Sequence, residues 1–295
     1  MELTIISGKG GTGKTTVAVA LADLNQNAVK ADCDVDAPNL YLYYKGEDLE
    51  REPFSGSKQA VVDEQLCIGC GVCESVCRFD AITGHTIDPF SCEGCGACAI
   101  ACPQKAISMV EQHDADVIMT KTDAGMLSRA EMAVGSEGSG KLITLLRKNA
   151  RATSGVGQWI IADGSPGVGC AVISSVTAAD LILIVTEPTL SGLEDFKRVI
   201  ELSEHFGIPA AVCVNKFDLN TDVTEQIYSY SAEHSVPVVG EIPFDATVPR
   251  SINELKPITH YENSAAAKAV RLLWQKLNTL IDSIESEKGR GKGAD

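Results

Sequence analysis

Gly8-Lys-Gly-Gly-Thr-Gly-Lys-Thr-Thr16 is the sequence that decides the fold, preceded by the apolar run Leu3-Thr-Ile-Ile-Ser7 and followed by Val17-Ala-Val-Ala-Leu-Ala22. An apolar β-branched run, then glycines, then an alanine-rich run predicts a strand, a phosphate-binding loop and a helix. The glycines let backbone N–H groups surround a polyphosphate, Lys14 extends to its β and γ phosphates, and Thr15 offers a hydroxyl to Mg²⁺. A glycine-rich turn without a ligand is the structural alternative, but the flanking strand and helix favour the nucleotide site. The predicted contacts to ATP or ADP come from the whole loop, that is from Gly8, Lys9, Gly10, Gly11, Thr12, Gly13, Lys14, Thr15 and Thr16.

Length and composition indicate a globular chain with an acidic surface. The 295 residues are 44% hydrophobic, which is enough for a sizeable core and about two domains. With 25 basic and 40 acidic residues the net charge is −15, which argues against a nucleic-acid partner. No charged and apolar leader precedes Leu3, and no apolar run reaches about 18 residues, so we expect neither a signal peptide nor membrane attachment. In the cytoplasmic protein that we therefore expect, eleven cysteines indicate metal or redox chemistry rather than disulfides.

Eight of the cysteines form two quartets with the same spacing. Cys67-Ile-Gly-Cys-Gly-Val-Cys-Glu-Ser-Val-Cys77 and Cys92-Glu-Gly-Cys-Gly-Ala-Cys-Ala-Ile-Ala-Cys102 both have the pattern C-x2-C-x2-C-x3-C, which is typical of bacterial ferredoxins with two [4Fe–4S] clusters. In such ferredoxins three cysteines of a run bind one cluster and the fourth binds the other. The predicted ligands are therefore Cys67, Cys70, Cys73 and Cys102 for the first cluster and Cys92, Cys95, Cys98 and Cys77 for the second. Zinc is the alternative, because C-x2-C pairs also form tetrahedral sites.

The repeat extends beyond the cysteines. Phe79-Asp-Ala-Ile82 and Gln104-Lys-Ala-Ile107 lie at equivalent offsets after their quartets, which indicates duplication of a unit of about 25 residues. A unit of that size is too small to hold a core without its clusters. Arg78 departs from the ferredoxin pattern, where proline is usual, and we expect it to alter the turn and the field at the cluster without changing the ligands.

Aspartates follow two further predicted strands. Ala28-Val-Lys-Ala-Asp32 leads into Asp32-Cys-Asp-Val-Asp36, and Gln158-Trp-Ile-Ile-Ala-Asp163 leads into a loop rich in glycine and proline. The carboxyl ends of parallel strands meet at the crevice where such sheets bind ligands, so these carboxylates are expected beside the phosphate loop. An acidic loop that is only solvated is the alternative.

The lysine that directly follows the first glycine of the loop indicates which class of phosphate-binding loop this is. Lys9-Gly-Gly-Thr-Gly-Lys-Thr15 resembles the deviant Walker A loop of the MinD/ParA/Mrp ATPases and of the nitrogenase iron protein. The resemblance implies that Lys9 crosses to the nucleotide of a partner subunit in an ATP-bound homodimer, where a cation stabilises charge on the transferred phosphate. A solvated loop lysine is the alternative.

The same resemblance assigns roles to residues outside the loop. It implies that Asp34 positions or deprotonates the attacking water in the vicinity of Mg²⁺, that Asp32 supports the magnesium shell, and that Asp163 binds Mg²⁺ through water. Asn39 matches an asparagine in switch I of MinD-type proteins. The residues that the resemblance places at the adenine base are Asn215, Pro243 and Asp245.

Three shorter features have more than one reading. Cys170 lies seven residues after Asp163, the offset at which the nitrogenase iron protein carries a ligand to its intersubunit cluster, and the alternative is a small buried residue at a helix start. Cys213 lies within a predicted strand and is expected in the core. Gly138-Ser-Gly-Lys141 precedes a predicted helix, and we favour a helix cap over an anion site.

Together these features predict the fold class. We expect a doubly wound, mostly parallel α/β sheet of the P-loop NTPase type, deviant Walker A class, with an inserted small α+β domain that resembles a two-cluster ferredoxin. The predicted boundaries are 1–57 and 111–285 for the ATPase domain, 58–110 for the ferredoxin domain and 286–295 for a disordered tail. An apolar stripe from Val270 to Ile284 at helical spacing predicts a helix that covers the sheet.

Three functions fit this combination. The leading hypothesis is an ATPase whose nucleotide-driven dimer rearrangement is coupled to electron transfer through two [4Fe–4S] clusters to a partner protein. The second is an assembly or carrier ATPase for iron–sulfur or other metallocofactors, resembling the Mrp-type carriers. The third is a positioning ATPase like MinD and ParA, which the acidic charge and polar tail disfavour.

Overall fold

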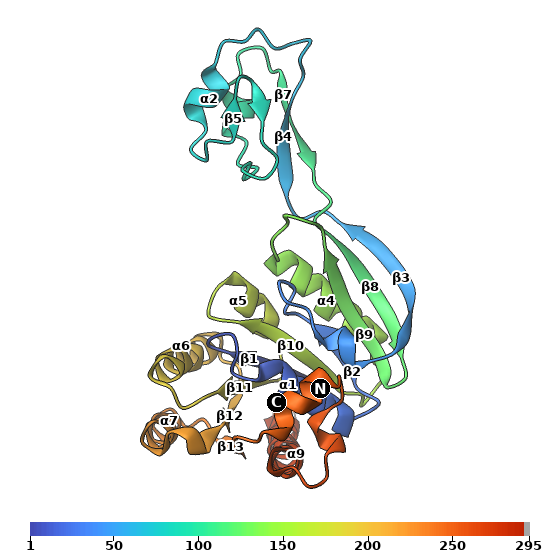
Figure 1. Ribbon diagram of the computed structural model, residues 1–295, viewed down its shortest axis with the longest axis vertical. Coiled ribbons are helices and arrows are strands. Elements are labelled where there is room, and N and C mark those ends of the chain that lie inside the picture. Colours follow the sequence, from blue (N-terminus) through green and yellow to red (C-terminus); the bar gives the residue numbers. More distant parts are fainter. Residues whose placement is uncertain (292–295) are drawn as a thin grey trace. The chain divides into compact units, whose positions relative to one another are not determined.

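The computed structural model describes residues 1–291, which form two compact units (Figure 1). The first unit contains Met1–Glu50, Ile118–Ala130 and the chain from Gly138 onward. The second unit contains Arg51–Val117 and Glu131–Glu137. The second unit thus includes the whole cysteine-bearing segment predicted at 58–110. It also includes Glu131–Glu137, which lies further along the sequence.

A nine-stranded sheet is the main element of the fold. Its strands in spatial order are β13 (Val238–Ile242), β12 (Ala210–Asn215), β11 (Leu181–Thr186), β1 (Glu2–Ser7), β10 (Ile160–Pro166), β2 (Val29–Asp32), β9 (Gly125–Met132), β8 (Ala115–Thr122) and β3 (Gly46–Phe54). Every pairing from β13 to β9 is parallel. In this register Asp163 of β10 lies beside Asp32 of β2, so the two carboxylates emerge at the same edge. The predicted mostly parallel α/β sheet is confirmed.

Helices cover both faces of the sheet, which explains why its central strands are continuous apolar runs. The helices of this unit are α1 (Lys14–Leu24), α4 (Gly140–Thr153), α5 (Cys170–Val176), α6 (Leu190–Phe206), α7 (Thr221–Glu233), α8 (Thr247–Asn253) and α9 (Ala265–Gly291), with short 3-10 turns η1 (Leu40–Tyr43), η2 (Phe217–Leu219) and η3 (Ile258–His260). On one face α1 and α9 pack through Leu21, Leu273 and Leu277. On the other, α6 and α7 pack through Phe196 and Ile227.

The second unit is small and repeats one motif. It contains the antiparallel pair β4 (Lys58–Val62) and β7 (Ile107–Glu111), the hairpin β5 (Ile82–Thr83) and β6 (Thr86–Ile87), and the short helices α2 (Val72–Val76) and α3 (Ala97–Ala101). Each helix follows a glycine in the left-handed region, Gly71 with φ 73° and Gly96 with φ 77°. The sequence repeat therefore corresponds to a structural repeat. The core is minimal, with Ala60, Ile82 and Ile107 packed around cysteines.

A buried lysine joins three parts of the first unit. Lys30 of β2 is fully buried, and its amine donates to the carbonyls of Ala28, at 3.1 Å, and Ala124. The amine also lies 4.8 Å from the centre of the Tyr44 ring. Burial lowers the pKa of Lys30 to about 8. The lysine therefore fixes the turn between β8 and β9 against β2.

Several elements differ from the sequence-based expectation. β3 and β9 occupy stretches for which no strand was expected, and β3 is exposed along nearly its whole length, so its sequence carries no apolar alternation. Residues 286–291 were expected in a disordered tail but belong to α9, because extending a helix already formed costs little. The rest of that tail, 292–295, lies outside the described residues. None of the described helices is long and apolar enough to cross a bilayer.

Candidate functional site

The phosphate loop connects β1 to α1 and has the backbone that its glycines permit. Gly11 and Gly13 have φ of 81° and 93°, in the left-handed region that side chains disfavour. A Cβ on Gly13 would also lie 2.4 Å from the side-chain nitrogen of Asn215, so this position has no room for one. α1 begins at Lys14, which leaves the first N–H groups of the helix directed at the loop.

Lys14 is held by carboxylates from two other strands. Its side chain is buried, and its Nζ lies 2.6 Å from Oδ1 of Asp163 and 3.1 Å from Oδ2 of Asp34. Burial alone would lower the pKa of Lys14, but the charges of Asp163 and Asp34 outweigh it and raise the pKa. The structure thus brings together the lysine and the two aspartates that the sequence placed at the phosphates.

Two carboxylate oxygens beside this lysine are buried without a hydrogen-bond donor from any described residue. They are Oδ1 of Asp32 and Oδ2 of Asp163. The other oxygen of Asp32 accepts the N–H of Leu40 at 3.0 Å and so fixes the start of η1. Burial, and then the charge of Asp163, raises the pKa of Asp32 to about 8. Oxygen donors of this kind fit Mg²⁺, which carboxylates bind directly or through water.

Asn39 was expected to match a switch I residue. Its exposed side chain donates to the carbonyl of Ala37 at 2.8 Å and so makes its hydrogen bond within its own loop.

Lys9 is not a solvated loop lysine. Its Nζ lies 2.9 Å from Oε1 of Glu187 and 3.0 Å from the hydroxyls of both Thr189 and Ser191. Burial alone would raise the pKa of Glu187, but hydrogen bonds from Lys9 and Lys216 outweigh it and lower the pKa. Sequence reasoning missed these partners, although their position after β11, the neighbour of β1, was a usable signal.

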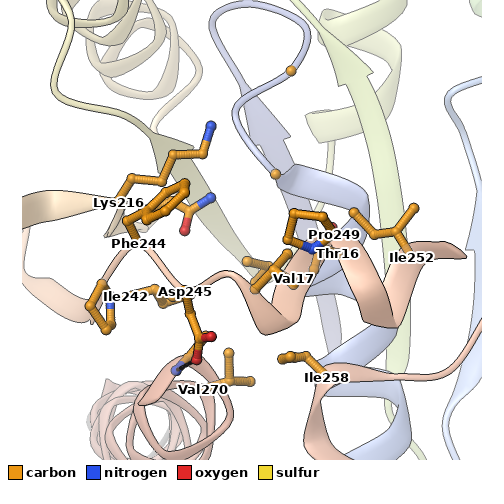
Figure 2. Close-up of a pocket in the computed structure, with 16 residues that line it drawn as sticks. Thr16, Val17, Lys216, Ile242, Phe244, Asp245, Pro249, Ile252, Ile258 and Val270 are labelled. Carbon is orange, nitrogen blue, oxygen red and sulfur yellow. Dashed lines mark hydrogen bonds between the residues drawn. The ribbon is translucent and has the colours of Figure 1, made fainter. Parts of the chain in front are cut away.

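A cavity of about 290 Å³ adjoins the loop. Figure 2 shows the residues around it, which come from α1, the end of β12, the β13–α8 loop, α8 and α9. The lining is Gly11, Gly13, Thr16, Val17, Asn215, Lys216, Ile242, Pro243, Phe244, Asp245, Val248, Pro249, Ile252, Ile258, Ala266 and Val270. Its mainly apolar walls suit a flat aromatic base.

The three predicted base residues differ in what their side chains do. The Asn215 amide donates to the carbonyl of Thr12 at 2.7 Å and so links β12 to the phosphate loop. Pro243 lines the cavity. Asp245 lines it too, but its carboxylate accepts from Ser264, at 2.6 Å, and from the N–H groups of Thr247 and Ala266. Burial opposes the effect, yet these hydrogen bonds lower the pKa of Asp245, whose carboxylate therefore organises the starts of α8 and α9.

The eight quartet cysteines line two separate cavities within the second unit. The first cavity is bounded by Cys67, Cys70, Cys73 and Cys102, and the second by Cys77, Cys92, Cys95 and Cys98. Each cavity therefore takes three cysteines from one run and one from the other. Thiolate sulfurs are the donors that iron–sulfur clusters require, so the donor set fits such a group. Among residues 1–291, no three His, Cys, Asp or Glu side chains surround a single ion position.

Cys170 and Cys213 lie outside the two cysteine cavities. Cys170 is exposed at the start of α5, so the expectation of a buried small residue is wrong at this position. Cys213 is fully buried in β12 as expected, and burial raises its pKa to about 12. Ser139 precedes α4 and accepts the N–H of Leu142 at 3.3 Å, which confirms the predicted helix cap.

Comparisons with known proteins agree with this geometry. A family model described as the CobQ/CobB/MinD/ParA nucleotide binding domain matches residues 3–258. An uncharacterized protein of Methanocaldococcus jannaschii is 36% identical over 284 residues, which cover 95% of this chain and 98% of that protein. An iron-sulfur cluster carrier protein of Pyrococcus horikoshii is 24% identical over 98% of this chain and 89% of its own length. The solved structure of the septum site-determining protein MinD from P. horikoshii, with Mg-ADP, has a TM-score of 0.58 at 18% identity and covers 96% of this chain and 98% of its own.

Proposed function

The chain belongs to the CobQ/CobB/MinD/ParA nucleotide-binding family, and from this premise we propose a Mg²⁺-dependent ATPase that controls electron transfer through two [4Fe–4S] clusters to a partner protein. The observation that carries the proposal is the presence of both sites in one chain. A phosphate loop with a base-sized cavity stands in one unit, and two four-cysteine cavities stand in the other.

Hydrolysis requires an exchange of partners at Lys14. Within the chain its amine is neutralised by Asp163 and Asp34. A triphosphate in the loop offers stronger negative charge, so Lys14 turns to the phosphates and frees both carboxylates. Asp34 would then orient the attacking water, and Oδ1 of Asp32 and Oδ2 of Asp163 are the oxygens that would hold Mg²⁺. The products are ADP and inorganic phosphate.

A homodimer completes the catalytic site in this proposal. Lys9 pairs with Glu187 of its own chain in the isolated protomer. To act on the nucleotide of a second copy, it must leave this pair, so dimer formation is an exchange of one anion for another. The resemblance of the loop to deviant Walker A sequences supports this role.

The cysteine-rich unit supplies the redox part of the proposal. When bound, [4Fe–4S] clusters carry single electrons between a donor and an acceptor. The crossed sets of three and one cysteines support two such clusters, and the small apolar core supports their structural necessity. The acceptor belongs to the class of redox proteins or metallocofactor enzymes.

A second candidate function is an iron–sulfur assembly or carrier ATPase. Relatives named as iron-sulfur cluster carrier proteins and the exposed position of Cys170 favour it. A cluster held between two copies of Cys170 would be cargo rather than a resident group.

The test is iron and sulfide analysis of anaerobically purified protein, followed by oxidation of the reduced protein by a viologen dye with ATP, ADP or no nucleotide. We expect about eight irons per chain and an oxidation rate that changes with nucleotide. Identical rates in all three states would refute the coupling. Excess iron that disappears in Cys170→Ser, and that transfers to an apo-ferredoxin, would favour the carrier.

A further inference from the structure

The Gly138-Ser-Gly140 segment that caps α4 also contacts the loop after Asp32. The N–H of Gly138 donates to Oδ1 of Asp36 at 2.8 Å, although the two residues are 102 positions apart. A Cβ on Gly138 would lie 2.3 Å from Cγ2 of the buried Val35. The segment is therefore seated directly on the loop that carries Asp34.

The same segment contacts the helix that follows Asp163. A Cβ on Gly140 would lie 2.4 Å from the hydroxyl of Ser174 in α5. About two turns further along α4, Arg147 donates to the carbonyls of Ser174 and Thr177, at 2.7 Å each. α4 therefore contacts the loop that carries Asp34 through Gly138 and the helix that follows Asp163 through Arg147.

The residues immediately before this segment belong to the other unit. Glu131–Glu137 is part of the cysteine-rich unit, where the N–H of Ala133 donates to the carbonyl of Asp114 at 2.8 Å. In the same unit, a Cβ on Gly135 would lie 2.8 Å from the Phe90 ring, two residues before Cys92. A single peptide bond therefore separates the Asp36 contact from a segment built into the cysteine-rich unit.

We propose that Gly138–Gly140 is a mechanical relay that transmits the nucleotide state from the aspartate loops to Glu131–Glu137 and so to the cysteine-rich unit. This inference rests on the proposed coupling of nucleotide to cluster chemistry and names the residues that carry it. It adds a path distinct from the direct chain connection after Asp34.

The trigger is the change of partner at Asp34. Its carboxylate binds Lys14, and its carbonyl accepts the N–H of Ala37 at 3.0 Å, forming one compact turn. When phosphate takes Lys14, the turn loses its anchor, and Asp36 lies only two residues away. Movement of that turn pulls on the Gly138 N–H, because the Asp36 carboxylate accepts that N–H directly.

A helix cap alone does not account for these contacts. Ser139 already caps α4, because its hydroxyl accepts the N–H of Leu142. Capping requires neither a hydrogen bond to Asp36 nor a residue without Cβ on each side of the serine. The glycines and the aspartate therefore need a further reason, and the relay supplies one.

The test is hydrogen–deuterium exchange on the full, cluster-loaded protein under anaerobic conditions, with the non-hydrolysable analogue AMP-PNP or with ADP. In the wild type we expect exchange within 131–138 to differ roughly tenfold between the two nucleotides. Asp36→Ala removes the acceptor and should reduce that difference to less than about twofold while nucleotide still binds. Asp36→Asn keeps an acceptor oxygen and should retain the difference.

A larger residue at position 138 tests the same contact from the other side. Gly138→Ala should abolish the exchange difference, because its methyl group would lie 2.3 Å from Cγ2 of Val35 and 2.7 Å from the Oδ1 of Asp36 that accepts the Gly138 N–H. Gly155→Ala, at the other end of α4 where the nearest atom would be 3.6 Å away, is the matched control and should behave as wild type.

The outcomes separate this inference from the proposed function. The relay is overturned if exchange within 131–138 is the same with both nucleotides, or if Asp36→Ala keeps the full difference. If the viologen oxidation rate nevertheless depends on nucleotide in those experiments, the proposed function stands and only the path is wrong. If that rate is independent of nucleotide in the wild type, the proposed function fails as well.

Discussion

Replacing Lys14 by methionine tests whether the buried charges of the nucleotide site are balanced as the structure indicates. The variant keeps the length of the side chain but removes the only cation bonded to Asp163 and Asp34 among the described residues. Three carboxylates, those of Asp32, Asp34 and Asp163, then share one buried region without it. We expect loss of ATP binding and a large loss of stability in the nucleotide-free protein.

The size of the effect follows from the burial of the pair. Removing one partner of a buried ion pair costs about 3–5 kcal/mol, because the remaining charge is left unpaired. We expect the variant to lose about 3 kcal/mol of unfolding free energy near pH 8. This is the low end of the range, because replacing the lysine also removes the cost of desolvating its ammonium group.

The pH dependence has a definite sign. Burial raises the pKa of Asp32 to about 8 and raises that of Asp34, and the charge of Lys14 opposes both shifts. A carboxyl whose folded pKa is raised stabilises the fold below its usual pKa near 4, and this contribution is lost as pH rises through the folded pKa. Without Lys14 both values rise further. A further rise in a folded pKa changes stability only above the folded pKa of the wild type, so the stability difference between variant and wild type should be smallest near pH 4. It should grow as pH rises through the folded pKa of Asp34, and grow again above about pH 8, where Asp32 of the wild type ionises.

Urea unfolding followed by tryptophan fluorescence measures this stability difference in the first unit, which contains Lys14. Trp159 and Trp274, the two tryptophans of the chain, pack at a tilt in the first unit with ring centres 4.8 Å apart. Lys197→Met, which removes a surface lysine, is the control and should have no measurable effect. Adding Asp163→Asn to Lys14→Met should restore part of the lost stability. A variant as stable as wild type at pH 8, or a difference independent of pH, would refute the reasoning.

Three further predictions concern the other contacts. Glu187→Gln removes the ion pair of Lys9, so the ATP-dependent dimer should bind about fivefold more tightly, as expected for a partly exposed ion pair worth about 1 kcal/mol. An unchanged or weaker dimer in analytical ultracentrifugation would count against the proposed exchange of partners at Lys9. Val270→Trp fills the cavity without changing Lys14, and it should weaken ATP binding by roughly a hundredfold in calorimetry. Unchanged affinity would show that the base binds elsewhere. Cys92→Ser should lower the iron content from about eight to about four per chain; an unchanged content would remove Cys92 from the ligand set.

The parts of the site that could be predicted from the sequence are those that depend on local pattern and strand direction. The run from Leu3 to Ala22 determines a strand, a loop and a helix by itself. Asp32 and Asp163 come together because they are register partners toward the carboxyl ends of two adjacent parallel strands. The equal spacing of the two cysteine runs indicated the crossed grouping that the two cavities display.

The parts that could not be predicted depend on contacts between distant, polar residues. β3 is a charged strand exposed on both faces, so it lacks the alternation that identifies strands. Glu187 binds Lys9 across 178 positions, and no local pattern encodes which acidic residue a lysine meets. Asp245 was expected to border the base, yet its carboxylate is occupied by Ser264 and two backbone N–H groups, a detail set by how α9 begins.

Both lysines of the phosphate loop have anionic partners within the chain. Lys14 is paired with Asp163 and Asp34, and Lys9 with Glu187. Binding free energy must first replace these pairs, so the net gain from phosphate contacts is smaller than the contacts alone would suggest. Phosphate contacts to Lys14 would release Asp163 of β10 and Asp34, which lies on the loop whose Asp36 accepts the N–H of Gly138. In the proposed mechanism the free energy used to replace these pairs drives movement of that loop, so a variant that binds ATP more tightly because it lacks them should transmit less of the nucleotide signal to 131–138.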